Sequence, residues 1–487
     1  MNEQTRDRIR LHWFRKYAVV FAVVLLAAVL QFSHERVQQD DYYHITSSVL
    51  IRQTGFYRQL PWAAKTVLTE RFADMHFLYH VLLIPFAYEN SLVPAKISAV
   101  LLAGLLAGFT LWFLRKRGIA YASFWTLLLM FGSSSFMIRS LAVRPITLSI
   151  VFYVAAVWFL LERRYVWLAP LSWLFVLTYP GFPVILAVVV VYVIVGIMNP
   201  GEKAGPDPRP LLLSLLGTGA GLVVNPYFPN NLRILYIQIL QRSFSDIGAG
   251  INLEWLPLTS WALFLSTWGV FIFLLAVLFL VLGARRKFSF QTQLLFALTL
   301  LFLFTFSRFA RGVDQFVPFG VLFAASAFND LRMDTGKILK WTATAVLAVV
   351  LCVNLYSAMR GLRSVDALDN RGSARWLEEN SPVGSTVFLF NYGAFPQLFY
   401  YNRHNVYTGG LDPIFVKALD PGLFDSLQDA LALRTDPYPV IRDRFGASYL
   451  HIENLPANRV FYLYCMERPD RFGRVYQDGF SAVFIVR

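Results

Sequence analysis

Residues 94–117 read PAKISAVLLAGLLAGFTLWFLRKR, and this stretch decides the class of fold. Its first part, as far as Leu114, is long and almost wholly apolar, and a helix needs about 20 such residues to cross a bilayer. Three basic residues, Arg115, Lys116 and Arg117, follow at once. Basic clusters of this kind are typical of the cytoplasmic end of a membrane span. The stretch therefore predicts a transmembrane helix with a cytoplasmic C-terminal end.

The apolar pattern recurs along the whole chain, which has 487 residues, of which 56% are hydrophobic and 15% charged, with a mean hydropathy of +0.51. A soluble protein of this length rarely has such a composition. We expect an α-helical polytopic membrane protein with about 11 transmembrane helices. The first span lacks a signal-peptidase site, so we expect it to be retained. The candidate spans are 17–34, 94–114, 120–138, 145–161, 165–179, 182–198, 210–224, 260–282, 290–306, 313–328 and 338–358.

Basic clusters set the expected orientation. The N-terminus is basic, and four later loops carry further clusters on the same side as Arg115, provided that segment 76–88 does not span. This agreement with the positive-inside bias predicts a cytoplasmic N-terminus, a cytoplasmic-membrane protein, and a helix at 76–88 that lies in the outer interface. It also accounts for the net charge of +14 without nucleic acid as a partner.

This threading leaves three substantial outer features: a first loop at 35–93, a second loop at 225–259 and a C-terminal part at 359–487. We expect residues 1–358 to form the membrane module. Short strand-like stretches, helix-like segments and turn signals in the C-terminal part are typical of a small α/β domain, here extracytoplasmic. The expected strands are 386–390, 448–452, 459–464 and 482–486, and the expected helices are 373–379 and 423–433.

The first outer loop opens with ERVQQDDYYH at 35–44. Asp40 and Asp41 are adjacent carboxylates at the membrane surface, where a carboxylate can act as a general base, a metal ligand or a charge partner. Tyr43 and His44 follow as candidate supporting or acceptor-side groups. The alternative is a solvated loop whose acidic residues only cap the next helix.

The same loop contains TERFADMHFLYH at 69–80. His76 and His80 are four residues apart, so one face of a helix presents both. With Asp74 or Asp41 they can bind a divalent metal, and Asp74 is also a candidate supporting group. The alternatives are that the pair holds a phosphate, or that the histidines only set the depth of an interfacial helix.

Basic side chains also lie at the outer corners between spans, where the positive-inside bias should exclude them. Arginine suits bidentate binding of phosphate, so we interpret them as candidate phosphate binders. The alternative is pairing with outer carboxylates such as Asp314. In the second outer loop, Glu254 beside Trp255 is either a second acid near the site or a rim charge. The corner arginines are Arg139, Arg144, Arg308 and Arg311.

Taken in order, these features resemble the GT-C glycosyltransferases. These polyprenyl-phosphate-dependent membrane enzymes include oligosaccharyltransferase catalytic subunits, protein O-mannosyltransferases and the aminoarabinose transferase. The resemblance rests on one span followed by a long outer loop that opens with QDDYYH. VNPY at 224–227, LEW at 253–255 and SRFARGVDQFVPF at 307–319 are also similar to stretches of bacterial members.

The resemblance implies a GT-C-like fold and inverting transfer of a sugar from a polyprenyl-phosphate-linked donor to a glycan, lipid or protein acceptor. It implies that Asp40 or Asp41 is the catalytic base or a metal ligand, and that a divalent metal, Mg or Mn, takes part. Several members carry a proline pair where this chain has Asp74 and His76, so the role of these residues stays open.

Two other functions are consistent with a polytopic chain: a transporter or flippase of a lipid-linked or anionic solute, and a non-catalytic membrane scaffold. Transporters place ionisable groups near the midplane of the membrane, within discontinuous helices. Here almost every charge lies at the end of a span. This placement favours an enzyme that works at the membrane surface.

Overall fold

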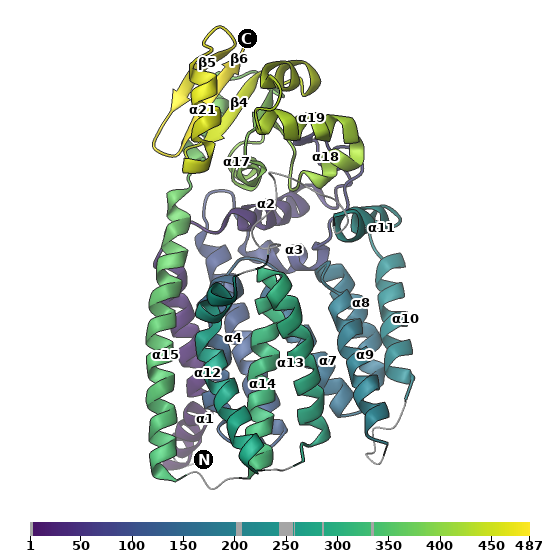
Figure 1. Ribbon diagram of the computed structural model, residues 1–487, viewed down its shortest axis with the longest axis vertical. Coiled ribbons are helices and arrows are strands. Elements are labelled where there is room, and N and C mark those ends of the chain that lie inside the picture. The colour runs from purple at the N-terminus through teal and green to yellow at the C-terminus, as the bar shows by residue number, and fades with distance from the viewer. Residues whose placement is uncertain (1–2, 201–206, 243–256, 258, 285–286, 333–335) are drawn as a thin grey trace. The chain divides into compact units, whose positions relative to one another are not determined.

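The computed structural model describes residues 3–200, 207–242, 257, 259–284, 287–332 and 336–487 (Figure 1). The chain forms two compact units. Unit 1 comprises Met1–His34, Lys96–Gly221 and Leu253–Arg363, and unit 2 comprises Glu35–Ala95, Leu222–Asn252 and Ser364–Arg487. Each unit is built from segments that are far apart in the sequence.

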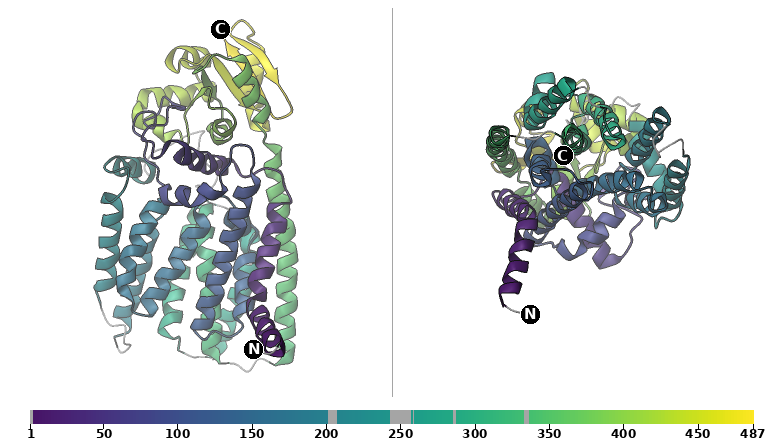
Figure 2. Two further views of the ribbon diagram at one scale, coloured as in Figure 1. Left: turned by 180° about the vertical axis from the view of Figure 1, so that it is seen from behind. Right: turned by 90° about the horizontal axis from the view of Figure 1, so that it is seen from below.

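Unit 1 is a set of helices whose axes run side by side, as the two views of Figure 2 show. Among the described residues, four helical stretches are long and apolar enough to cross a membrane: α4, α12, α13 and the one that begins with α15. The described residues also include seven shorter apolar helices, of which Phe77–Phe86 belongs to unit 2, and the predicted count of spans stays a prediction. The helices are α1 (Glu3–Gln31), α4 (Val93–Lys116), α5 (Ala122–Phe131), α6 (Ser134–Ser140), α7 (Ile146–Leu161), α8 (Leu168–Thr178), α9 (Pro183–Met198), α10 (Arg209–Val223), α12 (Ser260–Ala284), α13 (Phe290–Arg308), α14 (Val313–Leu331) and α15 (Lys337–Arg363).

The apolar run at 120–138, expected as one span, is two helices, α5 and α6. Ser133 caps α6 by accepting a hydrogen bond from the Phe136 amide at 3.2 Å, and its hydroxyl donates to the Ser266 carbonyl at 2.7 Å. A Cβ on Gly132 would lie 2.4 Å from the Leu128 carbonyl oxygen, so the backbone packs too closely there for a side chain. The glycine and the serine cap therefore interrupt the helix where hydropathy alone predicts continuity.

Unit 2 is built on a six-stranded mixed sheet of order β1-β3-β2-β4-β6-β5. The first four strands in this order are parallel, and β6 and β5 are antiparallel to their neighbours. The strands are β1 (Ala63–Ala64), β2 (Thr386–Leu389), β3 (Val406–Thr408), β4 (Tyr449–Glu453), β5 (Phe472–Gln477) and β6 (Ser481–Val486). The helices are α2 (Gln39–Thr54), α3 (Phe77–Leu83), α11 (Asn230–Leu235), α16 (Arg371–Asn380), α17 (Phe395–Tyr401), α18 (Ile414–Leu419), α19 (Pro421–Leu431), α20 (Pro437–Pro439) and α21 (Arg459–Met466).

The edge strand β1 comes from the first outer loop and pairs with β3, Ala63 with Tyr407 and Ala64 with Thr408. Helix α2 of the same loop packs against α17. The first outer loop therefore folds together with the C-terminal residues in unit 2, whereas the sequence predicted separate domains for them. The expected boundary at 358 also lies inside α15, which continues to Arg363.

The secondary structure of the C-terminal part largely follows the predictions. Strands β2, β4 and β6 and helices α16 and α19 are confirmed. The strand expected at 459–464 is wrong, because these residues form α21. Phe461 and Cys465 are four residues apart and both buried, which is helical spacing. A short apolar run does not by itself distinguish a strand from a helix. Here the burial of one helical face decides between them.

His451 is a buried histidine in the sheet of unit 2. It is buried in β4, with Nε2 3.1 Å from the Ser373 hydroxyl. Burial lowers the pKa of His451 from 6.5 to about 4, against the opposing charge of Asp478. Between these pH values the unfolded chain binds a proton that the folded chain does not, so stability falls as the pH falls.

We expect the free energy of unfolding to decrease by about 3 kcal/mol as the pH is lowered from 6.5 to about 4. Thermal unfolding of the protein in detergent at several pH values measures this. The variant His451→Gln should lose that part of the pH dependence, whereas His404→Gln, in a half-buried position elsewhere in unit 2, should keep it. Equal pH dependence in His451→Gln and wild type would contradict the assignment.

Candidate active site

The acidic pair lies in the first turn of α2. Asp41 is only 2% exposed, and its Oδ2 accepts a hydrogen bond from the Gln38 amide at 3.1 Å, which is one arm of a capping box. Asp40 is half-buried. Carboxylates are stabilised at the N-terminal end of a helix by the helix dipole. The two aspartates therefore differ: Asp41 serves the start of the helix, and Asp40 is the more accessible acid.

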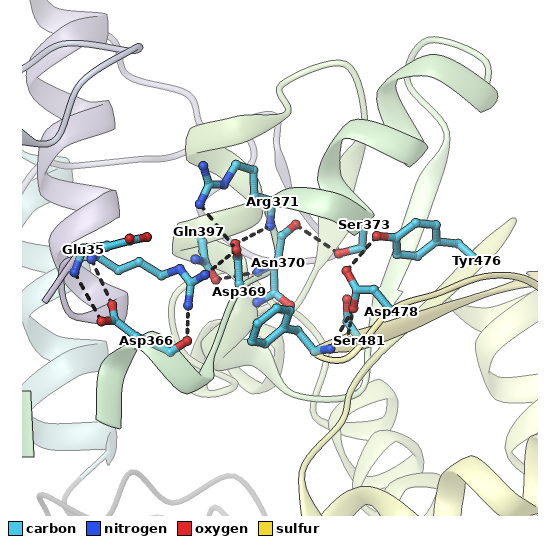
Figure 3. Close-up of polar contacts among 12 residues, drawn as sticks. Glu35, Asp366, Asp369, Asn370, Arg371, Ser373, Gln397, Tyr476, Asp478 and Ser481 are labelled. Atoms are coloured by element: carbon cyan, nitrogen blue, oxygen red, sulfur yellow. Dashed lines mark hydrogen bonds and ion pairs between the residues drawn. The ribbon is translucent and has the colours of Figure 1, made fainter. Parts of the chain in front are cut away.

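The chain just before α2 is held by residues of the 366–373 segment (Figure 3). The Asp366 carboxylate accepts hydrogen bonds from the Glu35 and Arg36 amides at 3.2 and 3.0 Å. The Arg36 guanidinium pairs with Asp369 at 2.6 Å and also donates to the Asp366 carbonyl. These contacts fix the backbone immediately ahead of the acidic pair.

A second link joins β4 to the first residue of α2. Glu453, 1% exposed, accepts hydrogen bonds from Asn370 Nδ2 and Asn391 Nδ2, both at 2.9 Å, and from Gln39 Nε2 at 3.4 Å. Burial raises the pKa of Glu453 despite the two asparagine hydrogen bonds. The C-terminal sheet thus positions the residue next to Asp40.

A buried histidine and carboxylate cluster lies in the same unit. Asp74 Oδ2 accepts from His80 Nδ1 at 2.6 Å, and Asp74 Oδ1 accepts from the His76 amide at 2.9 Å. His44 Nδ1 lies 2.7 Å from His80 Nε2. Because a carboxylate only accepts, His80 donates through Nδ1, and in its neutral form it accepts from His44 at Nε2.

Electrostatics keep Asp74 ionised. Burial alone would raise the pKa of its carboxyl group, but the charge of His80 and the hydrogen bonds from His80 and His76 outweigh burial and lower it. An ionised carboxylate that holds Nδ1–H of a histidine leaves the other ring nitrogen oriented and more basic. This is the arrangement in which proteins commonly present an imidazole to a metal.

One ring nitrogen from each of His44, His76 and His80 lies within 4.8 Å of the other two, which suits three ligands of one metal ion. The ligand set expected from the sequence was Asp41, Asp74, His76 and His80. The structure brings the two expected histidines together but adds His44 to them. Asp74 supports His80 through its hydrogen bond, and Asp41 is not a member of the trio. His44 was expected as a supporting group.

Tyrosines surround this cluster. Tyr43 packs edge-on against the His44 and His80 rings, with centroids 5.5 and 5.7 Å apart. Tyr57 stacks on Phe72 at 5.0 Å. Burial raises the pKa of Tyr43, Tyr57 and Tyr227, and the charge of Asp74 adds to the shift in each. All three therefore stay neutral hydroxyls near Asp74.

Tyr57 and Tyr227 were not among the site residues expected from the sequence. Tyr227 belongs to the VNPY stretch of the second outer loop. The resemblance drew attention to this stretch, but nothing in the sequence indicated that Tyr227 lies near Asp74. In unit 2 the first and second outer loops both contribute to the surroundings of Asp74. Glu254 and Trp255 lie outside the described residues.

The corner arginines all belong to unit 1. Arg139 is bound bidentately by Asp314, at 2.7 and 2.8 Å, as the pairing alternative expected. Arg311 donates to the Tyr179 hydroxyl at 2.5 Å. Arg308 lies over the Phe304 ring at 5.4 Å, and Arg144 is half-buried between α6 and α7. The charge of Arg139 is thus neutralised within the protein.

The fold is similar to those of solved membrane glycosyltransferases. A crystal structure of ArnT from Cupriavidus metallidurans bound to undecaprenyl phosphate matches 96% of this chain and 98% of its own, with a TM-score of 0.62 and 14% identity. The oligosaccharyltransferase of Archaeoglobus fulgidus, tethered to an acceptor peptide, matches 91% of this chain and 70% of its own, with a TM-score of 0.60 and 12% identity. This chain has a GT-C-like fold.

A further structure of the archaeal oligosaccharyltransferase, in complex with zinc and sulfate, matches 96% of this chain and 73% of its own with a TM-score of 0.54 and 12% identity. No protein-family model and no curated protein matches the sequence. This chain is thus similar to these glycosyltransferases in fold. Its reaction depends on the residues of its own site.

Proposed function

We propose that this GT-C-like protein is a membrane glycosyltransferase that transfers a sugar from a polyprenyl-phosphate-linked donor to an acceptor at the outer face of the cytoplasmic membrane. The observation that carries the proposal is a half-buried acid, Asp40, held at the start of α2 within this fold. The match to ArnT, solved with undecaprenyl phosphate, supports a polyprenyl-phosphate-linked donor.

In the proposed reaction an acceptor hydroxyl or amide attacks the anomeric carbon of the sugar. The bond between that carbon and the phosphate oxygen breaks, and polyprenyl phosphate leaves with the bonding electrons. Asp40 takes the proton of the acceptor as general base. Attack from the face opposite the phosphate inverts the anomeric centre. Arg144 and Arg311 are the corner arginines proposed to stabilise charge on the leaving phosphate, while Arg139 is neutralised by Asp314.

His44, His76 and His80 are proposed to hold a divalent metal. Three imidazoles suit a transition metal such as zinc better than magnesium or manganese, which prefer oxygen ligands. The archaeal oligosaccharyltransferase solved with zinc is consistent with this choice. A bound metal would supply positive charge for a phosphate oxygen. The buried Asp74 carboxylate would fix the orientation of His80.

Replacing Asp74 with asparagine is expected to weaken metal binding about 10- to 100-fold, because such outer-shell carboxylates orient the ligand and raise its basicity. Competition between the purified protein and a fluorescent zinc chelator measures the affinity directly, without an activity assay. Glu70→Gln changes an exposed acid four residues away and should leave the affinity unchanged. Wild-type affinity in Asp74→Asn would exclude Asp74 from this role.

Two measurements test the proposed function. Native mass spectrometry of the protein in mild detergent should detect polyprenyl phosphate, and the mass of any linked sugar would name the donor. Reconstituted with that donor and a membrane extract as source of acceptor, the protein should release polyprenyl phosphate. Transport of the lipid-linked sugar across the vesicle membrane without cleavage would instead favour a flippase. An inert protein would favour a scaffold.

The proposed orientation has the N-terminus in the cytoplasm and unit 2 outside. Reporter fusions after residues 116 and 286 should therefore be cytoplasmic, because both positions follow or lie within basic clusters. An external readout at both positions would place the acidic pair on the cytoplasmic side, and the donor would then have to be presented there.

A further inference from the structure

Unit 1 contains a second candidate binding site that the glycosyl-transfer reaction does not use. It is a cavity of about 350 Å³ between α5, α12, α14 and α15. Its lining is almost wholly apolar and includes Phe124, Trp125, Phe273 and Val277. Sites for small molecules in proteins have volumes of this order and are lined mainly by apolar side chains. The cavity is therefore suited to a hydrocarbon chain.

The cavity lies near one end of these helices. Tyr121 is the N-cap of α5, Leu280 is in the last turns of α12, Phe328 is in the last turn of α14, and Lys340 is in the first turn of α15. Trp341, next in sequence to Lys340, is 74% exposed. Tryptophan, tyrosine and lysine at a helix end are typical of the level of lipid headgroups.

The charge at this end is positive. Lys340 lines the cavity, with Nζ 5.9 Å from the centre of the Tyr121 ring. Lys337, one turn earlier, and Arg332, at the end of α14, are exposed. Asp330, the nearby carboxylate, accepts hydrogen bonds from the Ser289 amide and a threonine hydroxyl. None of the described residues that line the cavity is acidic.

We propose that this cavity holds one acyl chain of an anionic phospholipid whose phosphate lies against Lys340. The apolar walls account for the chain, and the lysine at the mouth, with Lys337 beside it, accounts for the headgroup charge. Such a lipid would join α15 to α5 and α12 by dispersion contacts along its chain. The proposal is independent of the glycosyl-transfer reaction.

Trp125 provides a local probe, because it is buried and lines the cavity. Phosphatidylglycerol with brominated acyl chains should quench its fluorescence, measured as the difference between wild type and Trp125→Phe. Two variants test the two parts of the site. Ala343→Phe fills the cavity and should abolish this quenching. Lys340→Gln removes a charge worth about fivefold in affinity and should raise the half-saturating lipid concentration by that factor.

Lys287→Gln is the matched control, since Lys287 is exposed and does not line the cavity. It should titrate like wild type. If brominated phosphatidylcholine quenches equally, and the quenching is unchanged in Lys340→Gln, the site does not require an anionic headgroup and that part of the proposal is wrong. Quenching retained in Ala343→Phe would overturn the cavity as the site. Displacement of the brominated lipid by polyprenyl phosphate at lower concentration than by phosphatidylglycerol would overturn the phospholipid and assign the cavity to the carrier lipid.

Discussion

Replacing Asp40 with asparagine is expected to lower the rate of sugar transfer by about 10²- to 10⁴-fold, because a positioned general base contributes a factor of this size. The amide is nearly isosteric but does not accept a proton. Because Asp40 is half-buried in the first turn of α2, the fold should tolerate the change. The measurement is release of polyprenyl phosphate by the reconstituted protein, with its melting temperature recorded beside it.

Asp41→Asn is the matched control for Asp40→Asn. The Asp41 carboxylate is buried and accepts a hydrogen bond from the Gln38 amide in the capping box. Loss of the carboxylate is expected to lower the free energy of unfolding by about 1 kcal/mol. Transfer activity should fall much less than in Asp40→Asn. The opposite result, an inactive but stable Asp41 variant beside an active Asp40 variant, would reverse the two roles.

The second large effect is expected at the ion pair between α6 and α14. Asp314 is 2% exposed and binds Arg139 through both oxygens. Replacing Asp314 with alanine removes the carboxylate that binds a nearly buried guanidinium through both oxygens, which is expected to cost about 3–5 kcal/mol. Thermal unfolding in detergent should show a correspondingly lower melting temperature.

The double variant Arg139→Met, Asp314→Leu separates a structural role from a role in donor binding. Apolar replacement of both partners of a buried pair is often neutral, so most of the lost stability should return. If the double variant is stable and transfers sugar, Arg139 is a structural residue. A stable double variant that no longer binds the donor would show that Arg139 binds phosphate. A melting temperature as low as that of Asp314→Ala would show that the broken ion pair is not the cause of the lost stability.

The structure separated residues that the sequence treated alike. In the sequence, the two acids of QDDYYH were equivalent. The fold distinguishes them, because only at the start of the folded helix α2 does the Gln38 amide lie within hydrogen-bond distance of the Asp41 carboxylate. The four corner arginines shared one rationale, anion binding on the wrong side of the membrane. Arg139 proved to have a partner 175 residues away, and no local pattern encodes such a distance.

What the sequence determined by itself was local. The apolar runs and basic clusters predicted a helical membrane protein, and the spacing of His76 and His80 placed them one helical turn apart, since side-chain direction follows helix periodicity. The GT-C-like fold was expected from a resemblance in the order of these features. Tertiary structure alone decided the rest. It brought His44 to His80 across 36 residues and set β1 of the first loop beside β3 of the C-terminal part. These pairings depend on which surfaces bury one another in the folded protein, and this cannot be predicted from the spacing of residues along the chain.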